Sequence, residues 1–499
     1  MRLKPGFLLL FLVVVLKFSM AQVTVQSFEG IDASTASGNV RCCVVDPNGA
    51  VGTKQYLEWV DTAYQAYDKT TFAPIYTTPK AGDSPWVLSG EVNCQGTDGN
   101  GVVMFDHLAS RWLIAVRQGS ISTGNYYFCI AVSNTDDLTS TTFKWYSYAQ
   151  LISAVLGKNA KGHTYFPDYP KIASWIDAYY VTIDIEDPDL GFQNVGVLTC
   201  AFDRASMILG HLQPRAPQCF RYLPSPTGVF LGHSLLPADI DGTVAPPTGT
   251  PEAFVSIENP STGSTSTTLN FWELKLNWIT PSLSTFTGPT AVTVPTYTPG
   301  CYDVTDPTAT ACVPEPSSAT TKVFIDSLGD RLMHRFAYRA FSTAPTQTYV
   351  VSQTVQVGSG SLSQTGIAWY QFRVGGVLVN SGIITSTDGN YRFVPSAAQD
   401  KMGNMAVGYS VSGTSLSPSI RAAYLNVRSK GVLTPTEFNI LTGTADEENT
   451  YRWGGYTSMT VDPVDDCTFW YVNEYFTTPQ SGPMLTWQTR ISNFQIPGC

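Results

Sequence analysis

Positive charge is scarce in this sequence. Its 499 residues include 29 Lys and Arg against 39 Asp and Glu, which gives a formal net charge of −10. Nucleic acids and anionic membrane surfaces are bound by basic faces, so this balance argues against both as partners. Histidine is also rare, and the five present are spread without the spacing of a metal or catalytic motif.

The short motifs of several enzyme classes are absent. There is no Gly-x-Ser-x-Gly, no His-Glu-x-x-His and no glycine-rich phosphate loop, which argues against a protease or an esterase. Acceptor sites for N-glycosylation are missing too, because the one Asn-x-Ser/Thr triplet, at residues 259–261, has proline in the middle. Among 19 asparagines a few such sites would arise by chance, so this absence favours a bacterial secretory route.

Long apolar runs are absent except at the N-terminus. Arg2 and Lys4 precede an apolar run over residues 7–16, and the small residues Ser19 and Ala21 follow it. This order is typical of a secretory signal peptide spanning residues 1–21. A membrane anchor is the alternative, but a span requires about 20 apolar residues. We therefore expect a secreted, extracellular chain without a membrane span, carrying 26 basic and 39 acidic residues after cleavage.

The ten cysteines are an even number, which suits disulfides in an exported protein. A zinc site is the alternative, but the sequence contains no Cys-x-x-Cys pair. Sequence alone cannot fix the connectivity. Spacing suggests three local pairs as hypotheses: Cys200 with Cys219, Cys301 with Cys312, and Cys467 with Cys499.

Helical periodicity is nearly missing, and this predicts an all-β chain. Short segments rich in Val, Thr, Tyr, Phe and Trp are separated by Gly, Pro, Asn and Asp. Strands centred on Trp145, Trp272, Trp369 and Trp487 recur after similar opening strands. Such repeated units of four strands predict a β-propeller of about seven four-stranded blades. The openings are expected near Gly52, Gly101, Asp168, Asp239, Asp330, Asp400 and Gly455.

The predicted domain organisation follows from this repeat. After the signal peptide, residues 22–50 form an N-terminal segment and residues 51–499 form the propeller. A Thr/Pro-rich insertion or long loop is expected near residues 285–319. A tandem of β-sandwich domains is the rival fold, but no low-complexity linker separates compact units.

Several blocks of the sequence resemble a known group of proteins. FPDYPKIASWIDAYYVT, SLGDRLMHRFAYR and RWGGYTSMTVDPVDDCTFWYVNEY are similar to segments of secreted, mostly bacterial proteins with a sialidase-like (BNR-type) propeller. The resemblance spans residues 51–499 and implies a secreted propeller, without an established reaction. The Asp-boxes of true sialidases match segments of this chain only loosely, and the Phe-Arg-Ile-Pro motif of sialidases is absent.

Polar residues at the strand openings are the candidates for a functional site, because inner strands of a propeller start near a central channel. Paired carboxylates there could share acid, base or nucleophile roles in glycoside cleavage, while arginines hold an anionic sugar and aromatic rings stack on sugar faces. The alternative is that these residues cap turns and fill the core. The catalytic candidates are Asp168, Asp241 and Asp330, and the ligand-binding candidates are Tyr169, Arg331, Arg452, Trp453 and Tyr456.

One acidic segment suggests a metal. The stretch DIEDPDLG lacks EF-hand spacing but could hold structural calcium through Asp184, Glu186, Asp187 and Asp189. The alternative is an exposed acidic loop. No other cofactor is expected.

These observations predict an extracellular, monomeric propeller that binds carbohydrate, with a polysaccharide or a cell-surface glycan as its partner. A glycoside hydrolase or polysaccharide lyase acting at the channel mouth is the main alternative. A structural or adhesion module is the third.

Overall fold

The structure, a computed structural model, describes residues 23–36, 45–96, 99–224, 233–258, 265–301, 311–341, 347–358, 364–426, 435–448, 450–479 and 486–499. The predicted signal peptide lies outside these ranges, as do Cys42 and Cys43. Within them, no helix is long and apolar enough to cross a membrane.

Four-stranded antiparallel sheets built from consecutive strands dominate the described chain. Their strands are rich in β-branched and aromatic residues, which pack well on a pleated surface. The first three sheets comprise β2 (Asn48–Val51), β3 (Gln55–Val60), β4 (Ala63–Asp68) and β5 (Lys80–Ala81); β6 (Val102–Asp106), β7 (Arg111–Ser120), β8 (Asn125–Ser133) and β9 (Trp145–Leu151); and β10 (Phe166–Ser174), β11 (Tyr179–Asp187), β12 (Gln193–Phe202) and β13 (Gln218–Tyr222).

The middle of the chain forms an eight-stranded sheet in which two antiparallel sets of four meet. Parallel pairing between β14 and β20 joins the two sets. The sets comprise β14 (Leu236–Asp241), β15 (Glu252–Ile257), β16 (Ser266–Lys275) and β17 (Thr285–Tyr297), and β20 (Leu332–Ala340), β21 (Gln347–Gln356), β22 (Thr365–Arg373) and β23 (Val377–Ile384).

Two further four-stranded sheets complete the main chain path, and short elements lie between the sheets. The sheets comprise β24 (Tyr391–Gln399), β25 (Met405–Gly413), β26 (Leu416–Leu425) and β27 (Thr436–Leu441), and β28 (Ser458–Val461), β29 (Thr468–Phe476), β30 (Trp487–Gln495) and β1 (Val25–Asp32). The short elements are α1 (Ser84–Ser89), η1 (Val92–Cys94), α2 (Ser153–Leu156), η2 (Pro188–Leu190), α3 (Arg204–Ile208), η3 (Pro281–Leu283), β18 (Ala311–Val313), α4 (Ser318–Thr321) and β19 (Ile325–Asp326).

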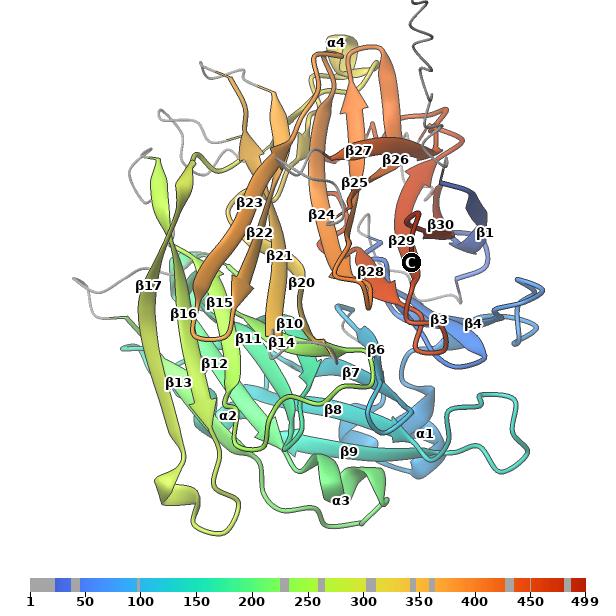
Figure 1. Ribbon diagram of the computed structural model, residues 1–499. Helices are drawn as coiled ribbons and strands as arrows, with labels where there is room; N and C mark the ends of the chain where they lie inside the picture. Colours follow the sequence, from blue (N-terminus) through green and yellow to red (C-terminus); the bar gives the residue numbers. More distant parts are fainter. Residues whose placement is uncertain are drawn as a thin grey trace, which may run out of the picture.

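The first strand of each set lies innermost. In Figure 1, β6, β10, β14, β20 and β28 surround the middle of the molecule, while β9, β13, β17 and β23 lie at the periphery. Each inner strand contacts the next along the chain, and β28 contacts β2, so the inner strands form a closed ring. This arrangement confirms the prediction of an all-β chain whose four-stranded sheets are arranged as in a β-propeller.

The N-terminal strand completes the last sheet. β1 pairs antiparallel with β30 and is the outermost strand of the sheet made by β28, β29 and β30. Residues 25–32, which the sequence places in a separate N-terminal segment, therefore belong to the last sheet. The last sheet therefore combines β1, from the N-terminal side of the chain, with three strands from the C-terminal side, and β1 lies at its outer edge.

The structure corrects the expectation of a loop or insertion over residues 285–319. β17 occupies the first thirteen residues of this range, paired with β16 at the end of its sheet. Its Thr and Val residues favour an extended chain. Pro289 and Pro295, which suggested a loop, are tolerated because an edge strand has one side without ladder hydrogen bonds.

All three predicted disulfides are present. Cys200 bonds Cys219, Cys301 bonds Cys312, and Cys467 bonds Cys499. A fourth disulfide joins Cys94 to Cys129, which stand 35 residues apart in the sequence, so spacing did not suggest the pair. The Cys94–Cys129 bond ties η1 to β8.

Candidate functional site

Charged side chains gather at the end of the ring where the inner strands begin, which we call the mouth. They come from four of the four-stranded sets, because the inner strands start side by side. The group, which we call the mouth cluster, comprises Asp46, Asp168, Asp184, Glu186, His233, Asp330 and Arg331, with Lys171 beneath it.

Three acids of the cluster lie on one face of the pair formed by β10 and β11. Asp168 is directly opposite Asp184 in the ladder, and Phe166 is opposite Glu186. Side chains directly opposite each other have Cβ atoms about 5 Å apart, and residues two positions apart on a strand share a face. Asp168, Asp184 and Glu186 therefore form a compact set of carboxyl groups.

Glu186 differs from an ordinary glutamate. It is buried, and burial together with the negative charges of Asp168 and Asp184 raises its pKa to about 8. An isolated glutamate has a pKa near 4.3. Glu186 therefore carries its proton at neutral pH, next to carboxyl groups that are more exposed or better hydrogen-bonded.

Asp184 is fixed by its neighbours. Its Oδ2 lies 3.0 Å from His233 Nδ1, and its Oδ1 accepts a hydrogen bond of 3.0 Å from the backbone N–H of Ser234. Burial and Arg331 oppose protonation of His233, but Asp184 and Asp330 outweigh them and raise the pKa of His233. Asp184 thus has little freedom to act on a ligand.

Asp168 is less constrained than Asp184. It is partly exposed, and it accepts a hydrogen bond of 3.2 Å from Asn100 Nδ2. Tyr169, the next residue, has a left-handed backbone with φ of 53°, and the ladder with β11 shifts register between Asp168 and Lys171. A bulge of this kind bends the strand and re-aims the neighbouring side chains.

Asp330 and Arg331 form a closed pair. Arg331 donates from Nε and Nη2 to the two oxygens of Asp330, at 2.7 and 2.9 Å. Its guanidinium also lies over the ring of Tyr169, 4.8 Å from the ring centre. Burial opposes ionisation of Asp330, but Arg331 and His233 outweigh it and lower the pKa of Asp330 to about 2.

Lys171 lies under the cluster. Its Nζ is 3.0 Å from the centre of the Tyr169 ring and 3.6 Å from that of the Tyr456 ring. The hydroxyl of Tyr456 donates to the carbonyl of Pro170 at 2.7 Å. The side chain of Lys171 is buried, and burial lowers its pKa.

The predicted aromatic platforms are not available to a ligand. Tyr169, Trp453 and Tyr456 are 8, 3 and 0% exposed, because their faces pack on cations and on the core. Trp453 Nε1 donates to Ser410 Oγ at 3.1 Å. Arg452, the remaining predicted ligand-binding residue besides Arg331, is exposed. Its positive charge favours the ionised form of buried Asp46.

The structure also separates Asp241 from the other two catalytic candidates. Asp239 accepts from the backbone N–H of Ser174 at 3.1 Å, so the ends of β10 and β14 are level. Asp168 stands six residues before Ser174 on β10, which corresponds to about 20 Å along a strand. Asp241 therefore lies at the far end of the ring.

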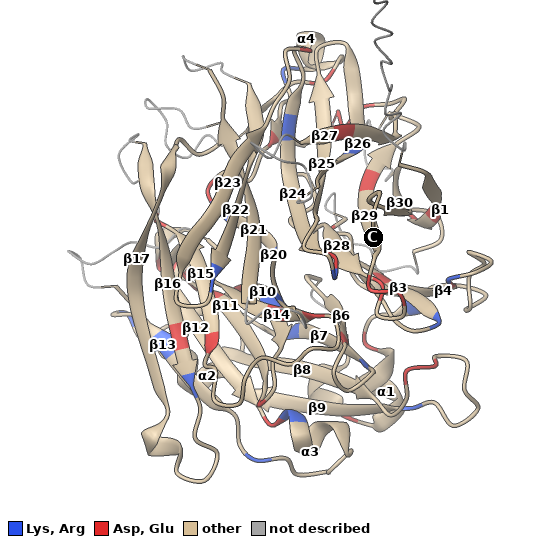
Figure 2. Cartoon of the chain, viewed as in Figure 1, with Lys and Arg blue, Asp and Glu red and all other residues tan. Residues whose placement is uncertain are grey.

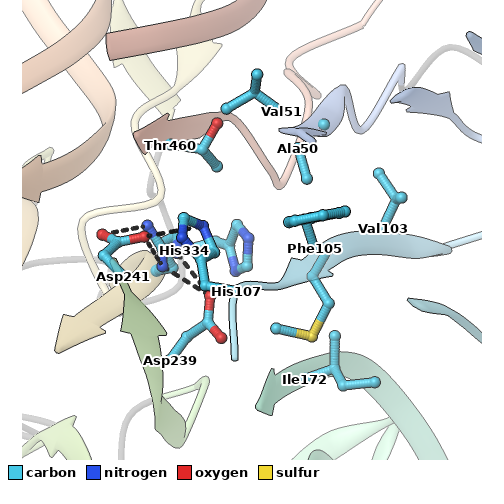
Figure 3. A pocket seen from close by; sticks show the side chains of 13 residues that line it. Ala50, Val51, Val103, Phe105, His107, Ile172, Asp239, Asp241, His334 and Thr460 are labelled. Atoms are coloured by element: carbon cyan, nitrogen blue, oxygen red, sulfur yellow. Dashed lines mark hydrogen bonds and ion pairs between the residues drawn. The ribbon is translucent and has the colours of Figure 1, made fainter. Parts of the chain in front are cut away.

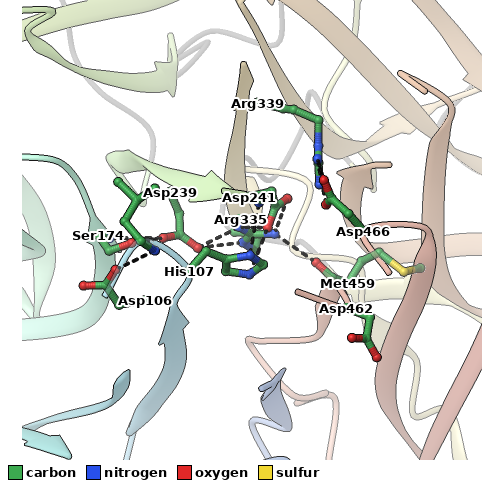
Figure 4. Close-up of polar contacts among 12 residues, drawn as sticks. Asp106, His107, Ser174, Asp239, Asp241, Arg335, Arg339, Met459, Asp462 and Asp466 are labelled. Atoms are coloured by element: carbon green, nitrogen blue, oxygen red, sulfur yellow. Dashed lines mark hydrogen bonds and ion pairs between the residues drawn. The ribbon is translucent and has the colours of Figure 1, made fainter. Parts of the chain in front are cut away.

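Asp239 and Asp241 are held by one arginine. Arg335 donates from Nη2 to Asp239 at 2.7 Å and to Asp241 at 2.8 Å, and it reaches the carbonyl of Met459 at 3.3 Å (Figure 4). Figure 2 shows residues of both charge signs close together around β10 and β14 in the middle of the molecule. The contacts of Arg335 hold inner strands of the ring together.

The space around these residues is too small for a sugar. The cavity in Figure 3, lined by His107, Asp239, Asp241 and His334 among others, has a volume of about 10 Å³. This is room for about one water molecule. The packed far end of the ring therefore supports structure, and Asp241 is not a catalytic candidate.

The four predicted calcium ligands do not converge. Asp184 and Glu186 belong to the mouth cluster, whereas Asp187 accepts from Asn159 Nδ2 at 2.7 Å and Asp189 lies 2.8 Å from His163 Nδ1. Alternate residues of a strand point to opposite faces, which divides the set. Among the described residues, no group of three or more His, Cys, Asp or Glu is arranged to hold a metal ion.

The sequence named Glu186 only as a calcium ligand and did not single out Asp46, Lys171 or His233. The alternation in Asp184-x-Glu186 was a signal for two carboxyl groups on one strand face. His233 had no such signal, because its partner Asp184 is 49 residues away and on another strand.

No family model matches the chain, and a search of the curated proteins finds no match. Among solved structures, an α-L-arabinanase from Penicillium chrysogenum complexed with arabinobiose is similar at 9% identity, with a TM-score of 0.40, over 95% of this chain and 99% of that one. A GH93 α-L-arabinofuranosidase of Fusarium graminearum is similar at 9% identity and a TM-score of 0.40, over 93 and 97%.

A subtype N10 neuraminidase-like protein of A/little yellow-shouldered bat is similar at 7% identity and a TM-score of 0.35, over 77% of this chain and 96% of that one. At these identities and scores the similarity does not extend to function. Any function must be inferred from the side chains at the mouth.

Proposed function

We propose that this chain is a secreted glycoside hydrolase with a seven-bladed propeller, in which each half of the eight-stranded sheet is one blade. The reaction takes place at the mouth cluster. Glu186 is the proton donor and Asp168 is the second carboxylate. The observation that supports this most is that Glu186, a buried residue whose pKa is raised to about 8, lies on the same face of the β10–β11 pair as Asp168.

Glycosidic bond cleavage requires two carboxyl groups in opposite protonation states. Glu186 meets the first requirement because its pKa is raised to about 8. The second carboxyl group must also be free to approach the sugar. Asp168 suits this role better than its neighbours do, since Asp184 is held by His233 and Ser234 and Asp330 is paired with Arg331.

In the proposed reaction the carboxyl proton of Glu186 passes to the glycosidic oxygen while the bond from that oxygen to the anomeric carbon breaks. The carboxylate of Asp168 either attacks the anomeric carbon or removes a proton from the attacking water. On the first route water then attacks the anomeric carbon, the bond to Asp168 breaks, and the proton of that water passes to Glu186. On the second route the water oxygen bonds to the anomeric carbon, and exchange with solvent removes the proton from Asp168 and returns one to Glu186. The separation of the two carboxyl groups with substrate bound decides between the two routes.

Binding without cleavage, which the sequence favoured, has less support. Sugar-binding platforms need exposed aromatic faces, and Tyr169, Trp453 and Tyr456 are buried. The extracellular location remains part of the proposal, supported by four disulfides.

The test is release of reducing ends from a panel of polysaccharides by the purified mature chain. Glu186→Gln is expected to lower the rate at least about 100-fold, because it removes the proton donor. Glu273→Gln, on an exposed position of β16, is the control and should leave the rate unchanged. Depletion of the protein by a polysaccharide without new reducing ends would contradict hydrolysis and favour the binding module.

A further inference from the structure

The positively charged side chains at the mouth influence which glycans the mouth cluster can bind. We propose that the mouth cluster accepts an uncharged glycan chain and disfavours carboxylated or sulfated glycans. This inference rests on the proposed function and adds the class of its substrate.

Arg331 and Arg452 are the residues on which the sequence relied to hold an anionic sugar. In the structure the edge of Arg331 formed by Nε and Nη2 faces Asp330, at 2.7 and 2.9 Å, and its plane lies on Tyr169. A bidentate pair of this kind satisfies the carboxylate and the guanidinium together. To bind a sugar carboxylate through this edge, Arg331 would have to leave Asp330, which would then be an ionised group without its partner.

The other two positively charged side chains of the cluster also interact with neighbouring groups. Lys171 is 1% exposed and its ammonium lies between the rings of Tyr169 and Tyr456. His233 has one ring nitrogen 3.0 Å from Asp184 and the other 3.9 Å from Asp330. Neither side chain presents a free positive charge to a ligand.

With Glu186 protonated, the acids left at the mouth are Asp46, Asp168, Asp184 and Asp330, and they lie with the cations Lys171, His233 and Arg331. Exposed Arg452 is a further cation nearby, and its charge acts on Asp46. These charges offset one another, so a glycan carrying carboxylate or sulfate groups would compete with the acids for their cations, which raises the free energy of its complex.

Uncharged sugars suit the groups that remain. Their hydroxyl groups can donate to carboxylates such as Asp168, which has two acceptor oxygens. Ser234 Oγ is buried beside Asp184 and has no hydrogen-bond partner among the described residues. Ser234 also has a left-handed backbone with φ of 70°, which is uncommon for a residue with a side chain and is found more often at binding sites.

The experiment uses matched pairs of polymers that share a backbone and differ in charge. Hydroxyethylcellulose is compared with carboxymethylcellulose, methyl-esterified polygalacturonate with its free acid, and dextran with dextran sulfate. Depletion of the mature protein and release of reducing ends are measured at low and high salt. We expect at least tenfold preference for the uncharged member of a pair, decreasing as salt screens the charges at the mouth.

Asp330→Asn provides the second arm. Replacing the carboxylate frees Arg331, so the variant is expected to move the preference at least tenfold toward the charged member. Glu273→Gln removes a carboxylate of β16 that is exposed and outside the cluster, and it should leave the preference unchanged. Thermal unfolding of each variant tests whether it is folded. If Asp330→Asn does not fold, the polymer pairs measured on the unaltered chain decide the question.

The possible results separate the two proposals. Preference for the charged members, with reducing ends released, would overturn the uncharged substrate class and leave the hydrolase in place. An unchanged preference in folded Asp330→Asn would also overturn it. If no polymer is bound or cleaved, the proposed function fails and the substrate class fails with it.

Discussion

Glu186 and Asp330 lie in one cluster, yet their carboxyl groups have opposite tendencies. Burial raises the pKa of Glu186, and the charges of Asp168 and Asp184 raise it further. Burial also opposes ionisation of Asp330, but the bidentate contact with Arg331 is stronger and the pKa falls to about 2. The type of neighbour, more than burial itself, decides which residue donates a proton.

This difference predicts the pH profile of the proposed hydrolase. Activity should fall as pH rises through about 8, because Glu186 then loses the proton that it donates. Asp184→Asn removes a negative charge that raises this pKa, so the alkaline limb should move to lower pH. The measurement is kcat/KM from pH 5 to 10. A limb that stays in place in Asp184→Asn would show that another group controls it.

Asp241→Asn is expected to affect stability and not chemistry. It removes half of the ion-pair arrangement around Arg335, and breaking a buried pair costs about 3–5 kcal/mol. Urea unfolding should show this loss, while reducing-end release per folded molecule stays within about threefold. Asp189→Asn, at a surface pair with Lys161, should shift the urea midpoint much less. Lost activity at unchanged stability would return Asp241 to the catalytic residues.

At the level of elements, the sequence predicted strands well and their ends less well. Gly101, Asp168, Asp330 and Gly455 do stand at or just before the start of an inner strand, but Gly52 and Asp400 directly follow one. Asp and Gly are favoured in tight turns at either end of a strand, so the composition of a turn does not show the direction of the chain.

The same ambiguity explains the misplacement of Asp241. In LPADIDG the sequence offered Asp239 and Asp241 as the opening of a strand, whereas these residues are the end of β14. Asp168 and Asp330 were placed correctly because the strands after them are long and apolar. The burial of Tyr169 and Tyr456 could not be predicted, since it depends on Lys171 and on packing between distant strands.

Pairing with β30 and a contact with β3 hold β1 in place. Glu58 of β3 accepts from the backbone N–H of Ile31 at 2.9 Å and from the hydroxyl of Tyr67 at 3.0 Å, and it also accepts from Thr489 of β30. One buried carboxyl group thus joins the N-terminal strand to the rest of the molecule.

Glu58→Ala should therefore destabilise the closed ring. Three hydrogen bonds are lost, each with a net value of about 1 kcal/mol, so the free energy of unfolding at pH 5 should fall by about 3 kcal/mol. Glu273→Ala, on an exposed position of β16, should change it by less than about 0.5 kcal/mol. Urea unfolding measures both. Equal midpoints for the two variants would mean that Glu58 does not hold β1.

For the molecule as a whole, closing a ring of sheets buries several acids whose burial outweighs any nearby cation. Glu58, Glu186 and Glu315 come from different parts of the ring, and burial raises their pKa values to about 7, 8 and 9. Others are buried beside cations, as Asp330 is beside Arg331. The two kinds of acid affect stability at opposite ends of the pH range.

Stability should consequently be greatest at mildly acidic pH. Glu58, Glu186 and Glu315 bind protons more tightly when folded, so their contribution is full below about pH 4.5 and is lost as pH rises through 7, 8 and 9. Asp330 and buried His107, whose pKa burial lowers to about 4, act in the other direction and lose their contribution as pH falls. Thermal unfolding from pH 3 to 10 should give the highest midpoint near pH 4–5 and a steady decrease above it. Glu315→Gln should flatten the decrease between pH 7 and 9, and a midpoint that rises up to pH 9 in the unaltered chain would show that these acids are ionised in the folded protein.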